Sequence, residues 1–278
     1  MLARRSLRTK LVAAVTAALL PIVALAAWHA MAEQRRDDLR RGEAVAAAVQ
    51  LAAARYRELI EGSHRLLVAA CSEDAVRQSA SPDPAPATIN RCEAYLGRVL
   101  GEFPGQYAAA LVTDERGIAR CSSLPTAVGV SFSERETFRM VRDTKAFSMG
   151  AQVASRLAPG TVIPAALPIM QGGAFSGMCA LDISLKAVGD LMTPAQTADN
   201  TVMALVDRNG DSVAGDSRAT RALPTASRLA AAIVGGQLMF SDFGQDSLFY
   251  DFRTLPLPGN SLFVVAAAPV ADNVLSLV

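Results

Sequence analysis

The sequence predicts an α+β protein in which a long N-terminal helix precedes two small modules, each an antiparallel sheet with helices packed on it. Three observations carry this prediction. Apolar residues recur every three or four positions from Glu33 to about Cys71, which is typical of a helix. Strand and turn patterns dominate from Tyr107 onward. A strand–turn segment at 110–117 is repeated at 204–210.

The N-terminal residues indicate a membrane anchor. Residues 1–10 carry four basic side chains and no acidic one, and no charged residue occurs in the 22 positions from Leu11 to Ala32. A helix needs about 20 apolar residues to cross a membrane. Because basic flanks stay inside, we predict a cytoplasmic tail at 1–10, a transmembrane helix at 11–32 and an exported body.

A cleaved signal peptide is the alternative. Ala30-Met31-Ala32 has the small-x-small form of a cleavage site. However, the apolar run exceeds the usual length of about 7–15 residues, and a charged helical pattern continues after it. We favour the uncleaved anchor. Cleavage after Ala32 would instead release a soluble periplasmic binding or accessory protein.

The helical part of the exported body is predicted at 33–101. The long helix contains no proline, and a Pro-rich loop at 79–86 separates it from a short helix at about 87–100. The purely structural interpretation is a helix that packs against the core and has a solvated charged face. A helix leaving a membrane can also transmit motion along its axis, and the sequence is compatible with both.

Two modules follow, at 102–190 and 191–278. In the first, strands are predicted at 107–112, 118–122, 161–170 and 174–185, with a polar, helical or irregular stretch at 133–145. In the second, strands are predicted at 202–206, 211–214, 247–254 and 261–269, with a helix at about 226–234 and a turn at 256–259. Ala110–Gly117 (ALVTDERG) is similar to Ala204–Gly210 (ALVDRNG), 94 positions later. Two copies are too few for a solenoid, so they indicate two modules.

Composition excludes two classes of protein. Hydrophobic residues make up 51% and charged residues 19%, which is too apolar for a disordered chain. The 27 Lys and Arg residues balance 26 Asp and Glu residues. A surface that binds nucleic acid normally shows a basic excess, so we expect no nucleic-acid partner.

No catalytic or metal motif is present. GxSxG, HExxH and GxxxxGK[ST] are all absent from the sequence. The segment Asp207–Asp211 begins like a calcium loop, but its sixth and twelfth positions hold Ser212 and Arg218 rather than Gly and Glu, so it predicts a hairpin turn. We expect no catalytic residue, no metal and no cofactor; an enzyme of unknown class is the least favoured alternative.

The four cysteines are widely spaced, without a CxxC pair that would indicate a zinc or thioredoxin-type site. An exported setting favours disulfides. Cys92 on the short helix and Cys121 at the end of the first hairpin are predicted to form a disulfide. Closing this loop of about 30 residues would stabilise the folded protein by about 3–4 kcal/mol. Cys71 and Cys179 either pair as well or remain buried free thiols.

The whole layout resembles a double Cache (dCache) domain, the extracytoplasmic sensor of bacterial chemoreceptors, histidine kinases and diguanylate cyclases. The resemblance covers about residues 33–275 and rests on three segments. Ala109–Gly117 is the shared strand and turn, Phe132–Phe138 (FSERETF) is similar to the family's D-R-x-Y-F, and Gly177–Ile183 (GMCALDI) is similar to a strand with a ligand-facing Asp. Glu134 replaces Asp and Thr137 replaces Tyr, so the aromatic pair that clamps amino acids in many members is absent.

The resemblance implies two tandem PAS-like modules and a non-enzymatic sensor in the bacterial inner membrane, single-pass, with its sensor domain in the periplasm. It implies a ligand in the membrane-distal module, 102–190, with 191–278 membrane-proximal. We further expect a homodimer and a signalling output domain or partner outside this chain. Family members usually return through a second transmembrane helix, for which 273–278 are too few residues, so we expect either a truncated product or signalling through a partner.

Arg135 and Asp182 are the principal ligand-binding candidates. Asp182 interrupts the apolar strand 179–183, where a carboxylate is costly unless it is paired or faces a wet cavity. Without the resemblance, Arg135 would be interpreted as a solvated or structural residue. Arg grips a carboxylate with two hydrogen bonds, and Asp accepts from an ammonium or hydroxyl group, so a small polar ligand, carboxylate or amino-acid-like, is expected. Phe138, on the same face as Arg135 if that stretch is helical, and Gln152 are predicted to add an apolar wall and a polar lining.

Overall fold

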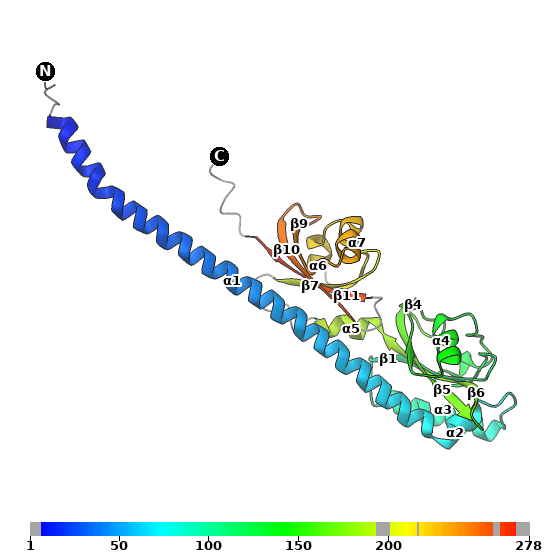
Figure 1. The fold of residues 1–278 in the computed structure, drawn as a ribbon. Helices are drawn as coiled ribbons and strands as arrows, with labels where there is room; N and C mark the ends of the chain where they lie inside the picture. Colours follow the sequence, from blue (N-terminus) through cyan, green and yellow to red (C-terminus); the bar gives the residue numbers. More distant parts are fainter. Residues whose placement is uncertain (1–6, 193–200, 216, 258–261, 271–278) are drawn as a thin grey trace. The chain divides into compact units, whose positions relative to one another are not determined.

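The computed structural model describes residues 7–192, 201–215, 217–257 and 262–270 (Figure 1). The chain forms two units, Met1–Ala46 and Ala47–Val278. Helix α1, Leu7–Ser72, contains Pro21 without ending there. Among the described residues, no helix is long and apolar enough to cross a membrane. The anchor at 11–32 stays a prediction, and much of the tail at 1–10 lies outside the described residues.

Three helices precede the first sheet. After α1 come α2 (Asp74–Ser79) and α3 (Pro86–Gly101), whose first residue is the proline that favours a helix start. Within the second unit, the buried side chains of α1 recur at the predicted helical spacing: Ala52, Ala53, Tyr56, Leu59, Ile60, Ser63, Leu67 and Ala70. The one polar member is satisfied, because the hydroxyl of Ser63 donates to the carbonyl of Leu59 at 2.7 Å.

The first sheet is antiparallel, with the strand order β2-β1-β6-β5-β3, and β4 also pairs with β5. Its elements are β1 (Tyr107–Thr113), β2 (Ala119–Ser122), a 3-10 turn (Pro125–Ala127), α4 (Glu136–Thr144), β3 (Ser148–Met149), β4 (Val153–Ala154), β5 (Thr161–Gln171) and β6 (Ala174–Ser184). Helix α5 (Leu185–Met192) follows β6 directly.

Alternate side chains of the strands point to opposite faces of this sheet, and different helices cover the two faces. Met178, Ala180 and Asp182 of β6 face the side covered by α4, whereas Cys179 faces α1 and α3. Figure 1 shows α4 on one side of β5 and β6 and α3 on the other. Two disulfides attach α1 and α3 to the sheet. Cys71–Cys179 links α1 to β6, with Cα atoms 6.0 Å apart. Cys92–Cys121 links α3 to β2, with Cα atoms 6.2 Å apart. The second is the pair predicted from the sequence, and the first is one of the two alternatives left open there.

The second sheet repeats the first. Its strand order is β8-β7-β11-β10-β9, all antiparallel. Its elements are β7 (Val202–Asp207), β8 (Ser212–Gly215), α6 (Ser217–Ala222), α7 (Ala226–Val234), β9 (Met239–Phe243), β10 (Phe249–Pro256) and β11 (Leu262–Pro269). Helices α6 and α7 pack on it through Ala219, Leu229 and Ile233. Residues 258 and 259 of the predicted turn lie outside the described residues.

The repeated sequence segment has one physical cause in both modules. At the end of β1, Asp114 Oδ1 accepts the backbone N–H groups of Arg116 and Ile118, both at 2.9 Å. At the end of β7, Asp207 Oδ1 accepts those of Asn209 and Asp211, at 2.8 and 3.0 Å. Each aspartate therefore closes the turn with its side chain, which explains why the acid recurs.

The glycine of each turn is required as well. Gly117 and Gly210 have φ values of 81° and 80°, the left-handed region that favours glycine. A Cβ atom would lie 2.8 Å from the backbone nitrogen of Ser133 in the first turn and 2.2 Å from the carbonyl oxygen of Ala226 in the second. The turn therefore lets the following chain pack directly against it.

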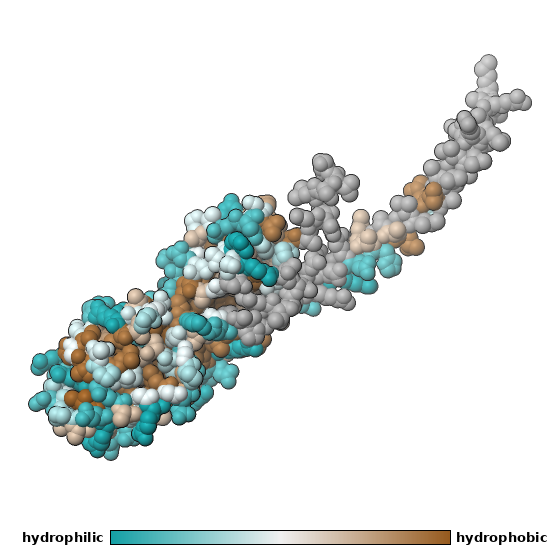
Figure 2. All heavy atoms as spheres, turned by 180° about the vertical axis from the view of Figure 1, so that it is seen from behind, coloured by the Kyte–Doolittle hydropathy of each residue, from teal (hydrophilic) through white to brown (hydrophobic). Residues whose placement is uncertain are grey.

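Hydrophobic and hydrophilic residues are interspersed on the face of the molecule drawn in Figure 2.

Candidate ligand site

A cavity lies between the first sheet and the chain around the start of α4. Its volume is about 30 Å³, room for roughly two water molecules. The lining is mainly apolar, with three charged side chains: Leu111, Phe132, Arg135, Thr137, Val153, Ala154, Ser155, Arg156, Val162, Pro164, Met178, Ala180 and Asp182. Arg135 and Asp182, the two principal candidates from the sequence, thus line the same cavity.

Asp182 is a buried carboxylate with few partners to stabilise its negative charge. The residue is 8% exposed, and its carboxylate Oδ2 accepts one hydrogen bond, from the hydroxyl of Ser155 at 3.5 Å. Burial raises the pKa of Asp182 from 3.8 to about 6, although the positive charge of Arg135 and the Ser155 hydrogen bond oppose the rise. A carboxyl group held this far from its ordinary pKa in a cavity is typical of functional sites.

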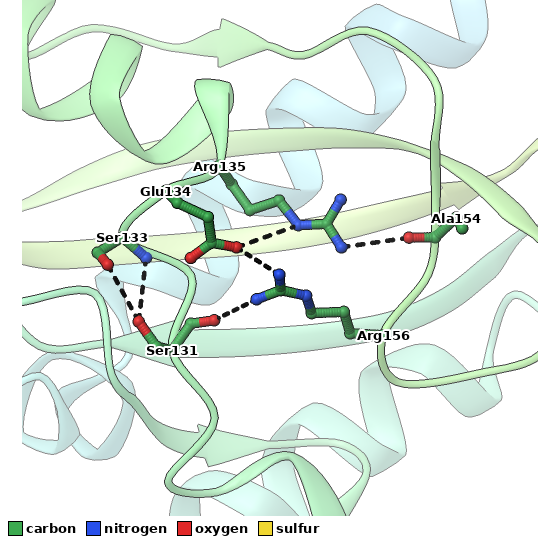
Figure 3. Close-up of polar contacts among 6 residues, drawn as sticks. All are labelled: Ser131, Ser133, Glu134, Arg135, Ala154 and Arg156. Atoms are coloured by element: carbon green, nitrogen blue, oxygen red, sulfur yellow. Dashed lines mark hydrogen bonds and ion pairs between the residues drawn. The ribbon is translucent and has the colours of Figure 1, made fainter.

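Arg135 is aimed at the cavity by an extended backbone. It directly precedes α4 with φ −68° and ψ 135°, so it stands outside the helix. One guanidinium nitrogen, Nη2, donates to the carbonyl of Ala154 at 3.3 Å, and Nε lies 3.9 Å from Glu134 Oε1 (Figure 3). Within the described part of the chain, Asp182 has no ion-pair partner within 4.0 Å. The cation and the anion share the cavity without touching.

The same backbone geometry moves Phe138 away from the predicted wall. The expectation that Arg135 and Phe138 share a face required both to be helical, and Arg135 is not. Phe138 instead lies in the core, 1% exposed, edge-on to Phe175 with ring centroids 5.9 Å apart. Gln152 is also outside the cavity lining; its Oε1 atom is buried without a hydrogen-bond partner in the described structure.

Three polar lining residues were not predicted from the sequence. Thr137 is buried, and Gly150 is packed so closely on it that a Cβ there would lie 2.1 Å from Thr137 Oγ1. Ser155 holds its own loop, because its hydroxyl accepts the N–H groups of Leu157 and Ala158 at 3.1 and 3.2 Å. Arg156 supplies a second positive charge to the lining. A lone arginine in a polar loop has no sequence signal that separates it from a solvated residue.

The arrangement suits recognition of a small molecule with charges at both ends. A guanidinium group can hold a carboxylate with two parallel hydrogen bonds, and Asp182 can accept from an ammonium or hydroxyl group. Ser155 is the nucleophile type nearest to Asp182, but no histidine lines the cavity to activate it.

Comparisons with known proteins address the fold. No family model matches the sequence, and no curated protein matches it. Solved structures do: an extracellular ligand-binding receptor from Desulfohalobium retbaense has 13% identity and a TM-score of 0.61, covering 80% of this chain and 39% of that one. The sensor domain of the V. cholerae histidine kinase DctB has 14% identity and a TM-score of 0.60, covering 80% and 96%.

A third similar structure is the ligand-binding domain of the Pseudomonas fluorescens chemoreceptor CtaA in complex with L-alanine. It has 14% identity and a TM-score of 0.55, covering 80% of this chain and 93% of that one. This chain therefore spans about two fifths of the D. retbaense receptor and nearly all of the other two domains. The chain has the fold of the extracellular sensor domains of histidine kinases and chemoreceptors, the fold that its resemblance to double Cache domains implies.

Proposed function

We propose that the chain is the sensor part of a bacterial signal-transduction receptor and binds a small carboxylate-bearing molecule in the module at 102–190. One observation carries the proposal. Arg135 and Asp182 come from different elements, line one cavity and make no ion pair with each other. A ligand with a carboxylate at one end and an ammonium or hydroxyl group at the other would complete both.

The solved structures support this ligand class. CtaA is in complex with L-alanine, which carries both a carboxylate and an ammonium group. The aromatic clamp of many family members is missing here, because Thr137 stands where they have Tyr. The proposed class therefore includes short carboxylates and hydroxy acids as well as amino acids.

The proposed sensing mechanism involves a conformational change, because the cavity in this structure is too small for a ligand. Ligand pockets typically have volumes of about 300–1,000 Å³, and the present cavity of about 30 Å³ is far smaller. The ligand would bind an open state better than this closed one and shift the balance between them. The family resemblance extends the proposal to a homodimer that passes the shift to an output domain or partner.

We expect Arg135→Ala to weaken ligand binding by roughly 10- to 150-fold, because a charged hydrogen-bond partner is worth about 1.5–3 kcal/mol. A thermal-shift screen of the purified 278-residue chain against amino acids, carboxylates and purines identifies the ligand, and calorimetry measures its affinity. Arg139→Ala is the matched control, since Arg139 is exposed and lies one turn along α4. Equal affinities in Arg135→Ala, Asp182→Ala and the control would place the ligand elsewhere.

The membrane anchor is part of the proposal and has its own test. If residues 11–32 form an uncleaved anchor, the mature protein keeps Met1 and stays in the membrane fraction after a carbonate wash, because a spanning helix resists extraction. The soluble alternative requires cleavage after Ala32. Detection of Glu33 as the mature N-terminus would decide for that alternative and leave the proposed ligand site unaffected.

A further inference from the structure

A carboxylate of the chain itself, that of Glu134, contacts both arginines that line the cavity. Glu134 Oε1 forms an ion pair with Arg156 Nη2 at 2.6 Å and lies 3.9 Å from Arg135 Nε. Figure 3 shows the Glu134 side chain reaching between the two guanidinium groups. Both arginines that line the cavity therefore face one internal anion.

The same three residues connect the chain before α4 with the segment at 154–156. Arg135, from the chain before α4, donates to the carbonyl of Ala154 on the opposite segment at 3.3 Å. Arg156, from that opposite segment, donates back to the carbonyl of Ser131 at 2.7 Å (Figure 3). Glu134 completes the set by bridging the arginines. We call these contacts of Glu134, Arg135 and Arg156 the latch.

We propose that Glu134 is a built-in competitor for the ligand. A ligand carboxylate would take its place on Arg156 and Arg135, release the latch and open the cavity. The inference rests on the proposed function and deepens it, because it assigns Arg156 as a second residue that binds the ligand carboxylate.

The exposure of Glu134 makes the exchange feasible. Its side chain is 53% exposed, so it can turn into solvent without leaving an uncompensated buried charge. An ion pair this exposed is weak, so a ligand carboxylate with better geometry can replace it. A guanidinium edge presents its two parallel N–H groups to one carboxylate at a time, so both anions cannot use the same edge.

Glu134→Gln tests the latch, because it keeps the size of the side chain and removes the charge that competes. Calorimetry with glycine, which carries a carboxylate and an ammonium group, should show roughly three- to fivefold tighter binding than wild type. Glu136→Gln is the matched control. It makes the same charge change two residues away, on an exposed side chain without a hydrogen bond or ion pair among the described contacts.

A second measurement needs no ligand. In the absence of glycine, the backbone amides of residues 153–160 should exchange with deuterium roughly three- to fivefold faster in Glu134→Gln than in wild type, because that segment opens when the latch is broken. Glu136→Gln should exchange like wild type. Equal exchange in all three proteins would overturn the latch.

The outcomes separate the latch from the ligand site. If glycine binding depends on Arg135 but Glu134→Gln binds no more tightly than Glu136→Gln, the latch is wrong and the ligand site stands. If no variant binds glycine or any carboxylate of the screen, the proposed site fails and the displacement proposal fails with it. If Glu134→Gln binds glycine more tightly and Arg156→Ala weakens it, both proposals are supported.

Discussion

Removal of the Cys71–Cys179 disulfide should lower the free energy of unfolding by about 5 kcal/mol, the largest effect expected of any change discussed here. The bridge spans 108 residues and ties α1 to β6, and the entropy removed from the unfolded chain grows with loop length. The double variant Cys71→Ala, Cys179→Ala avoids placing a hydroxyl group beside the core. Denaturant unfolding followed by circular dichroism measures the loss.

The second disulfide provides the comparison. Cys92–Cys121 spans 29 residues, so its removal should cost about 3.5 kcal/mol, less than the longer bridge. Treatment of wild type with a reductant should reproduce both losses together. A Cys71/Cys179 double variant as stable as wild type would mean that the bridge does not restrain the unfolded chain.

Asp182→Asn should stabilise the protein at pH 7 by up to about 3 kcal/mol. The pKa of Asp182 is raised from 3.8 to about 6 by burial, and each pKa unit corresponds to about 1.36 kcal/mol. The folded protein binds this proton more tightly than the unfolded chain does, so the contribution of Asp182 to stability falls as the pH rises from about 4 to about 6. Asparagine carries no charge to desolvate and is free of this loss.

The pH dependence distinguishes this cause from general repacking. The stabilisation by Asp182→Asn should be large at pH 7 and should shrink toward zero below about pH 4, where the wild-type carboxyl is protonated in both states. Asp114→Asn is the control of opposite sign. Asp114 is fully buried but paired with Arg120 at 2.7 Å, so its replacement should destabilise. A gain in stability that is independent of pH would contradict the assignment to Asp182.

Such a gain would also be informative about function. A buried carboxyl whose pKa is raised is typical of functional sites, and the proposed ligand recognition would use its charge. Asp182→Asn should accordingly gain stability while losing affinity for a ligand that donates to the carboxylate.

The sequence predicts the order and type of the long strands and of the helix at 226–234, because strand alternation, glycine turns and helical spacing are local properties. The helix at 226–234 and the strands starting at 107, 161, 174 and 202 begin where they were predicted. Strand β9 was not predicted: its sequence, MFSDF, is short, and it forms a strand by pairing with the adjacent β10 at the edge of the sheet. Edge strands of this kind depend on a partner that lies outside their own sequence window.

The residues of the candidate site also fall into those that the sequence indicates and those that only the tertiary structure reveals. The sequence alone singled out Asp182, because a carboxylate in an apolar strand is anomalous wherever that strand lies, whereas Arg135 entered through the family resemblance. Only the tertiary structure brings the two residues to one cavity, adds Arg156 and removes Phe138. The reason is that α4 begins one residue after Arg135, so Arg135 and Phe138 point in different directions. The pairing of distant side chains depends on where helices end and loops cross, and those are properties of the packed chain.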